Sequence, residues 1–234
     1  MYRSAIFASL FALACAGPSS NDDTAGNGND QNVDGPPVDA TVVVLDAMSG
    51  AGVEGVVVED LEGTTVNTDG SGMATIPVAS DSTFELLLKQ DGAPDHLLFG
   101  PTADEAFQYI TFMATDTLIT LVLSLLEESV DEGTGVVVVG IDYDDLSPVV
   151  GAAAALDVSH TDPWVLTSLG ASYSDTIPAG GMGMVAFANV QPGEFTASVV
   201  PPDGVDCTAF PSGGEMPAAP VAANQVTVVT FHCR

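Results

Sequence analysis

A short run of carboxylates is the part of the chain best suited to chemistry, because Asp142, Asp144 and Asp145 follow directly on an apolar segment. Calcium takes six to eight oxygen ligands, and carboxylates in one loop can supply several of them. The EF-hand pattern is missing, and with 32 acidic residues such runs also arise by chance. The three aspartates are therefore candidate calcium ligands, and the alternative is a solvated loop.

The other reactive residues form no familiar catalytic pattern. His160 and Asp162 can share one face of a strand, but a catalytic zinc site usually takes three protein ligands. The sequence has no Gly-x-Ser-x-Gly motif, no His-Glu-x-x-His motif and no phosphate-binding loop. We therefore expect no catalytic residues and no cofactor. Trp164, the one tryptophan of the chain, is either a ligand platform or a core or rim residue.

The N-terminal segment combines a positive residue, a short apolar run and a cysteine. Arg3 precedes the run from Ala5 to Ala14, and Cys15 follows it. A membrane-spanning helix needs about 20 apolar residues, so this run predicts a secretion signal over residues 1–14. Residues 15–38 then predict a disordered tether, because they are rich in Gly, Ser, Asn, Asp and Pro.

The end of the apolar run resembles the lipobox of bacterial lipoproteins, with Ala14 directly before Cys15. The family most often has Leu where this chain has Ala12. The resemblance implies cleavage before Cys15 and acylation of its thiol and new amino terminus, which anchors the protein in a membrane. Ala16 is not acidic, which by the same resemblance favours the outer membrane. Ordinary signal cleavage is the alternative, and it would give a soluble secreted protein.

The two remaining cysteines lie near the C-terminus. With Cys15 acylated, Cys207 and Cys233 form an even pair in an oxidising compartment. We expect a disulfide between them, which would destabilise the unfolded chain by about 3.5 kcal/mol on the loop-entropy model. Two unpaired buried thiols are the alternative.

The charge balance is extreme, with 32 acidic residues against three Lys and Arg and a net charge of −29. Nucleic acids are bound through cationic contacts to phosphates, so this composition excludes a nucleic-acid partner. The same charge repels anionic headgroups, so any membrane attachment must come from a lipid. The acidity favours a soluble monomer and indicates either a salty habitat or cation binding.

Short β-branched runs separated by turns predict a mainly β protein. In the first half, the expected strands lie near residues 40–45, 56–58, 64–66, 73–78 and 83–89. Beyond Lys89 the pattern gives way to a loop and then to a helix over residues 117–128, with Thr115 or Asp116 as its N-cap. The apolar face of this helix would carry Leu118, Leu121, Val122, Leu125 and Leu126.

The second half, residues 134–234, predicts another β domain. Its expected strands lie near residues 135–141, 153–158, 182–190, 195–200 and 225–233. Pro192-Gly193 predicts a hairpin turn between two of them.

Both halves resemble the carboxypeptidase regulatory-like domain, a transthyretin-like β-sandwich. The resemblance is carried by residues 44–58 and 68–74 in the first half and by residues 151–154 and 183–195 in the second. It implies two small Ig-like sandwich domains, residues 39–128 and 134–234, joined by the short helix. It also implies non-catalytic modules that act as spacers or binding domains.

These observations predict a non-catalytic, lipid-anchored protein of the bacterial cell envelope or surface that acts as a structural or interaction module. Its expected partners are the membrane, through the lipid, and an unidentified protein or glycan. The alternative is a ligand-binding or adhesion protein for a divalent cation, glycan or peptide. A hydrolase with an unrecognised site is a third possibility.

Overall fold

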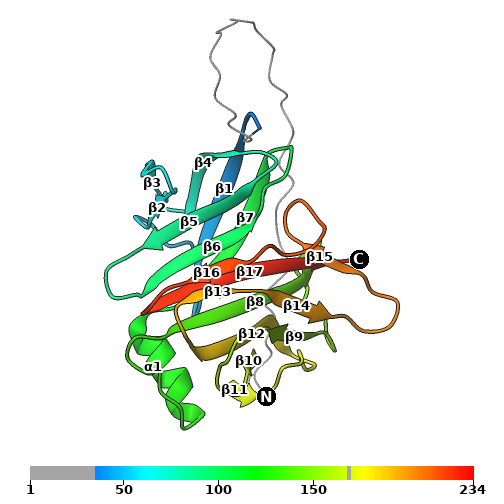
Figure 1. Ribbon diagram of the computed structural model, residues 1–234. Helices are drawn as coiled ribbons and strands as arrows, with labels where there is room; N and C mark the ends of the chain where they lie inside the picture. Colours follow the sequence, from blue (N-terminus) through cyan, green and yellow to red (C-terminus); the bar gives the residue numbers. More distant parts are fainter. Residues whose placement is uncertain (1–34, 168–169) are drawn as a thin grey trace, which may run out of the picture. The chain divides into compact units, whose positions relative to one another are not determined.

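The computed structural model describes residues 35–167 and 170–234, which are mainly β as the sequence predicts (Figure 1). The first half contains β1 (Pro37–Asp46), β2 (Val57–Glu59), β3 (Thr65–Asn67), β4 (Met73–Ala79), β5 (Thr83–Lys89), β6 (Asp95–Pro101), β7 (Phe107–Met113) and α1 (Asp116–Leu125). The second half contains β8 (Gly135–Tyr143), β9 (Ala153–Leu156), β10 (Trp164–Thr167), β11 (Gly170–Tyr173), β12 (Gly181–Val190), β13 (Gly193–Phe195), β14 (Ala197–Val200), β15 (Cys207–Ala209), β16 (Ala219–Val221) and β17 (Gln225–Cys233).

One large mixed sheet joins the two halves, with the strand order β11-β10-β12-β8-β17-β6-β5-β2-β3. The last strand of the chain, β17, lies inside this sheet and runs parallel to both of its neighbours, β6 and β8. Val226 of β17 is opposite His96 on one side and Val136 on the other. The C-terminal end of β17 pairs with β15, beyond the end of the β6 pairing.

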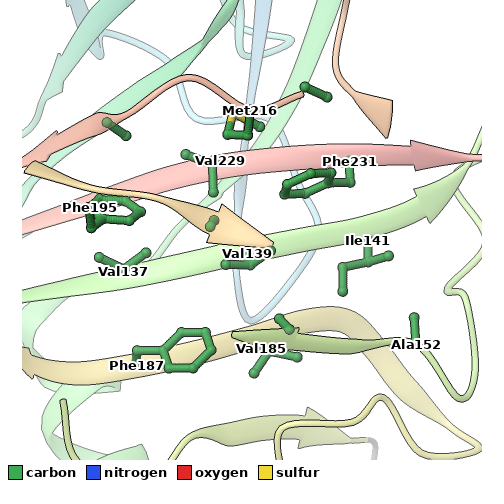
Figure 2. Close-up of a cluster of buried hydrophobic side chains, with 14 of the residues drawn as sticks. Val137, Val139, Ile141, Ala152, Val185, Phe187, Phe195, Met216, Val229 and Phe231 are labelled. Carbon is green, nitrogen blue, oxygen red and sulfur yellow. The ribbon is translucent and has the colours of Figure 1, made fainter. Parts of the chain in front are cut away.

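The strands at the centre of the large sheet are apolar on both faces, which is why β8 reads as a continuous valine run. On one face, Val137, Val139 and Ile141 pack into a cluster around Phe187, which we call the Phe187 core (Figure 2). The small sheets β13–β16 and β14–β9 contribute Phe195 and other side chains to this core.

A second cluster, the Tyr109 core, uses the alternate residues of the same strands. Val136 of β8 and Val228 of β17 belong to it, together with Leu98 of β6. The separate three-stranded sheet β4-β1-β7 contributes residues such as Val42 and Tyr109. Since successive strand residues point to opposite faces, the large sheet forms a wall of both cores.

The shared sheet changes how the two predicted domains relate to each other. Residues 34–234 form one compact unit, and the Tyr109 core draws buried residues from both sides of the interval 128–134. The sequence could not indicate this, because the β6–β17 pairing joins segments more than a hundred residues apart. Whether the chain on either side of residues 128–134 folds independently, as the predicted domain division implies, remains a prediction.

The helix is shorter than predicted. It begins with Thr115 as N-cap, whose hydroxyl accepts a hydrogen bond from the Leu118 N–H at 3.3 Å. It ends at Leu125 rather than at residue 128, because Glu127 takes a φ of 57° and the Glu128 N–H donates to the Leu123 carbonyl. The predicted apolar face is wrong in part, since Leu121 and Leu125 are 52% and 62% exposed. In the described part of the chain, no helix is long and apolar enough to cross a membrane.

Two further sequence predictions are wrong. The segment after Lys89 contains β6 and β7 rather than a loop; β6 is buried on both faces and so lacks the alternation that marks a strand. Pro192-Gly193 is not a hairpin turn, because it carries the chain from β12 in the large sheet to β13, which pairs with β16.

The structure confirms the predicted disulfide between Cys207 and Cys233. The two residues are paired across β15 and β17, and Cys233 is buried in the Phe187 core. The bond therefore holds the C-terminal end of β17 in place and closes a separation of 26 residues.

Replacing both Cys207 and Cys233 by Ser should lower the free energy of unfolding by about 3.5 kcal/mol, because the cross-link no longer restricts the unfolded chain. Urea unfolding with and without reductant measures the effect. The parent protein should lose stability in reductant, and the double variant should not respond. A parent whose unfolding midpoint is the same in reductant would contradict the assignment.

A fragment of residues 35–133 should fail to fold as a monomer. It lacks β8 and β17, so the edge of β6 and one wall of the Tyr109 core would be exposed. Circular dichroism and size-exclusion chromatography test this beside the full chain. A monomeric fragment with a cooperative unfolding transition would instead show that the first half is an independent domain.

Candidate functional site

The three aspartates predicted as calcium candidates point in different directions. The Asp145 carboxylate accepts hydrogen bonds from the backbone N–H and the hydroxyl of Ser147, which lower its pKa and close a turn. Asp144 lies 3.2 Å from Nε of Arg234 and 3.7 Å from Nδ1 of His232. Among the described residues, no group of three His, Cys, Asp or Glu side chains is placed to hold a metal ion. The structure therefore does not bring the three carboxylates together as one site.

Asp142 differs from its neighbours because it is largely buried. It lies near the end of β8, and burial raises its pKa to about 7 from an ordinary value of 3.8. Its carboxylate lies against the backbone of Gly183, whose φ is 74°, and a Cβ at that position would collide with Oδ1 of Asp142. The glycine in β12 thus makes room for the carboxylate.

Asp142 is part of the wall of a cavity of about 180 Å³, which we call the apolar cleft. The cleft lies between the large sheet, β7 and α1. The sheet contributes side chains of β8 and β12 such as Val138 and Met184, and the helix contributes Leu118 and Val122. Most of the lining is aliphatic or aromatic, which is typical of pockets that bind small molecules.

Few polar side chains line the apolar cleft. Nδ1 of His96 lies 2.9 Å from the Pro94 carbonyl, which can only accept, so the ring carries its proton there. Burial lowers the pKa of His96 and keeps it neutral. The indole N–H of Trp164 is buried and has no hydrogen-bond partner among the described residues. Thr111 and Asp142 are the other polar side chains of the lining, and Asp142 is the one carboxylate among the described residues of the wall.

A second cavity of about 370 Å³ adjoins the apolar cleft, and the two share Ile110, Asp142 and Leu146 as lining residues. It is bordered by Asp144 and His232 on the strands' C-terminal side. The exposed side chain of Leu146, 51% accessible, lies where the two cavities meet. Asp142 is therefore placed between an apolar chamber and a more polar one.

Sequence reasoning found some of these residues and missed others. Trp164 was predicted to be either a ligand platform or a core or rim residue, and the structure places it in the cleft wall, partly buried against the Tyr109 core. Asp142 was predicted as a candidate calcium ligand, whereas in the structure its carboxylate lies in the wall of the apolar cleft. The sequence did not mark His96 or Met184 as cleft residues, because their place in the lining depends on which strands are neighbours in the sheet. Cys15 and the predicted tether up to residue 34 lie outside the described residues.

Comparisons with known proteins do not establish a family. No protein-family model matches the chain, and no curated protein matches it. The resemblances to lipoproteins and to carboxypeptidase regulatory-like domains therefore remain predictions.

Solved structures with some similarity include three surface or pilus proteins. The Bacillus anthracis TIE protein is 13% identical with a TM-score of 0.28, over 84% of this chain and 34% of that one. GBS52, the minor pilin of Streptococcus agalactiae, is 13% identical with a TM-score of 0.28, over 84% and 95%. The shaft pilin SpaA of Lactobacillus rhamnosus GG is 10% identical with a TM-score of 0.25, over 84% and 98%. This chain spans about a third of the Bacillus anthracis protein, and TM-scores this low do not establish a shared fold.

Replacing Asp142 by Asn should stabilise the protein at pH 8. The folded-state pKa of Asp142 is raised, so the folded protein holds its proton up to a pH of about 7, while the unfolded chain releases it near 3.8. Stability from this group therefore falls as pH rises through that window, and the loss is complete above pH 7. Asn does not titrate, so the variant should gain on the order of a few kcal/mol at pH 8 and little near pH 4.

Urea unfolding of both proteins from pH 4 to pH 8 measures the difference. His96 and His232, whose pKa values are lowered, oppose this trend below about pH 6.5 in both proteins and cancel in the comparison. Parallel stability curves for the two proteins would show that Asp142 is not buried as described.

Proposed function

We propose that this chain is a non-catalytic structural or interaction module of a bacterial cell envelope or surface, held at a membrane by acyl chains on Cys15. The observation that carries the location is the Cys207–Cys233 disulfide, because such bonds persist in oxidising compartments outside the cytoplasm. The apolar run that ends at Ala14 also supports export from the cytoplasm, because it has the length of a secretion signal.

The anchoring part of the proposal rests on the resemblance to a lipobox. A single acyl chain gives only marginal membrane binding, whereas two or more give stable anchoring. The net charge of −29 leaves no basic surface that could replace the lipid. The membrane contact is therefore assigned to Cys15 alone, with the outer membrane as the favoured location and plain secretion as the alternative.

The structural role is supported by how the described residues are held together. The large sheet forms a wall of both hydrophobic cores, and the disulfide fixes the strand at its centre. Such an arrangement suits a rigid spacer or a scaffold for surface contacts. No nucleic-acid partner fits the net charge of −29.

A second candidate function, ligand binding, is favoured by one observation. The apolar cleft places the Asp142 carboxylate in a wall that is mostly aliphatic or aromatic. A divalent cation is a poor fit there, because calcium needs several oxygen ligands and the neighbouring carboxylates point elsewhere.

Expression of the full gene in a bacterium should give a membrane-bound product whose intact mass starts at Cys15 and includes acyl chains. The Cys15→Ser variant should lose the acyl mass and leave the membrane fraction, because no thiol remains to be modified. A variant that combines Cys15→Ser with Ser19→Cys is a matched control. It keeps a cysteine in the segment, but this cysteine no longer follows the apolar run directly. This variant should also be soluble. A parent protein found in the aqueous fraction with an unmodified N-terminus would contradict anchoring.

A further inference from the structure

We propose that the apolar cleft binds an amphipathic amine, with its hydrocarbon part between the large sheet and α1 and its ammonium group against the Asp142 carboxylate. This inference concerns a site that the anchoring proposal does not use, and it stands whether or not Cys15 is acylated.

The walls of the cleft suit a hydrocarbon. Val138, Met184 and Val122 present aliphatic or thioether surface, and the cavity measures about 180 Å³. A dry apolar cavity of about 150 Å³ is large enough to hold a benzene ring. Methionine side chains adapt their shape to a ligand better than branched residues do. An apolar group of this size therefore has both the space and the surroundings it needs.

The residues of β8 that line the cleft are Val136, Val138, Gly140 and Asp142. Trp164 is paired with Ala186, and Ala186 with Val138, so the backbone of Trp164 is level with Val138. Asp142 is four residues further along the same strand, which corresponds to about 13 Å. A ligand that lies along this wall has an apolar body with its charged group at one end.

The charge of the ligand follows from what Asp142 lacks. No Lys or Arg among the described residues lines either cavity. Lys89 is paired with Glu59 at 2.7 Å, and Arg234 is paired with Asp144 at 3.2 Å. The Asp142 carboxylate has neither a hydrogen bond nor an ion pair within the described part of the chain. Burying an unpaired carboxylate is costly, so a cation from outside is the complement that this wall lacks.

Two further features favour an amine over a neutral or acidic ligand. The strongly negative protein attracts cations and repels anions on approach. A primary ammonium group is compact and donates up to three hydrogen bonds, which suits one carboxylate.

Trp164 also makes the proposal easy to test, because it is the only tryptophan of the chain and lines the cleft. Its fluorescence should report a ligand directly. The full chain is titrated at pH 8 with octylamine, octanol, octanoate and butylamine, and calorimetry gives the affinities. A primary amine remains cationic at this pH.

We expect octylamine to bind saturably with one site and to change the Trp164 fluorescence. Octanol should bind at least tenfold more weakly, because it lacks the charge-assisted hydrogen bond. Butylamine should also bind more weakly, because it buries less hydrocarbon, and octanoate should not bind.

Two variants locate the charge recognition. The Asp142→Asn variant should bind octylamine at least tenfold more weakly than the parent protein and should bind octanol with unchanged affinity. Asp145→Asn is the matched control, because this residue is three positions away, carries the same charge and does not line either cavity. It should leave octylamine binding unchanged. Circular dichroism confirms that both variants are folded.

Several results would overturn the proposal. Equal affinity for octanol and octylamine would show a cleft that accepts any hydrocarbon. An equal loss of octylamine binding in both variants would show general attraction to an acidic surface. If Trp164 fluorescence stays constant with every probe but changes with protein concentration, a second copy of the chain covers the cleft. If Trp164 fluorescence changes neither with the probes nor with protein concentration, the cleft binds no amine.

Discussion

The structure depends on the position of β17 between β6 and β8. This strand is the last of those described, and β6 and β8, which come from different halves of the sequence, both run parallel to it. Strands buried on both faces are mainly apolar, and in β8 and β17 the valines point to both faces and serve both cores. Without β17, the Phe187 core and the Tyr109 core would each lose part of a wall.

The apolar cleft is a consequence of the same arrangement. The face of the large sheet that contributes to the Tyr109 core also continues past it, where β7 and α1 lie over β8 and β12 without filling the space. Asp142 interrupts the apolar row of β8 at this point, and Gly183 on the neighbouring strand leaves room for its carboxylate. A charged residue in such a wall lowers stability unless something compensates for it. This cost is the physical reason for assigning the position a role in binding.

The sequence predicted what depends on local pattern and missed what depends on distant pairing. The strand at residues 225–233 was predicted with its observed bounds, because its valines and its aromatic residue mark a buried strand. The Thr115 cap and the cysteine pair were also predicted, since each follows from short-range chemistry. The pairing of β17 with β6 could not be predicted, because no local feature of Asp95–Pro101 identifies its partner. Asp142 was noticed for its charge, but its burial depends on which strands lie beside it, such as β12 with Gly183. Leu121 and Leu125 were expected to be buried because helical spacing does not reveal which side of a helix meets a sheet.

Native-state hydrogen exchange is the most direct test of the central claim that one strand holds both halves together. The backbone amides of β6, β8 and β17 should exchange only through global unfolding and should report one common free energy. The same value should apply to β1 and β7, whose side chains pack on the shared Tyr109 core. If the amides of β1, β6 and β7 exchanged through a separate opening of lower free energy while β8 and β17 stayed protected, the two halves would be independent and the account would be wrong.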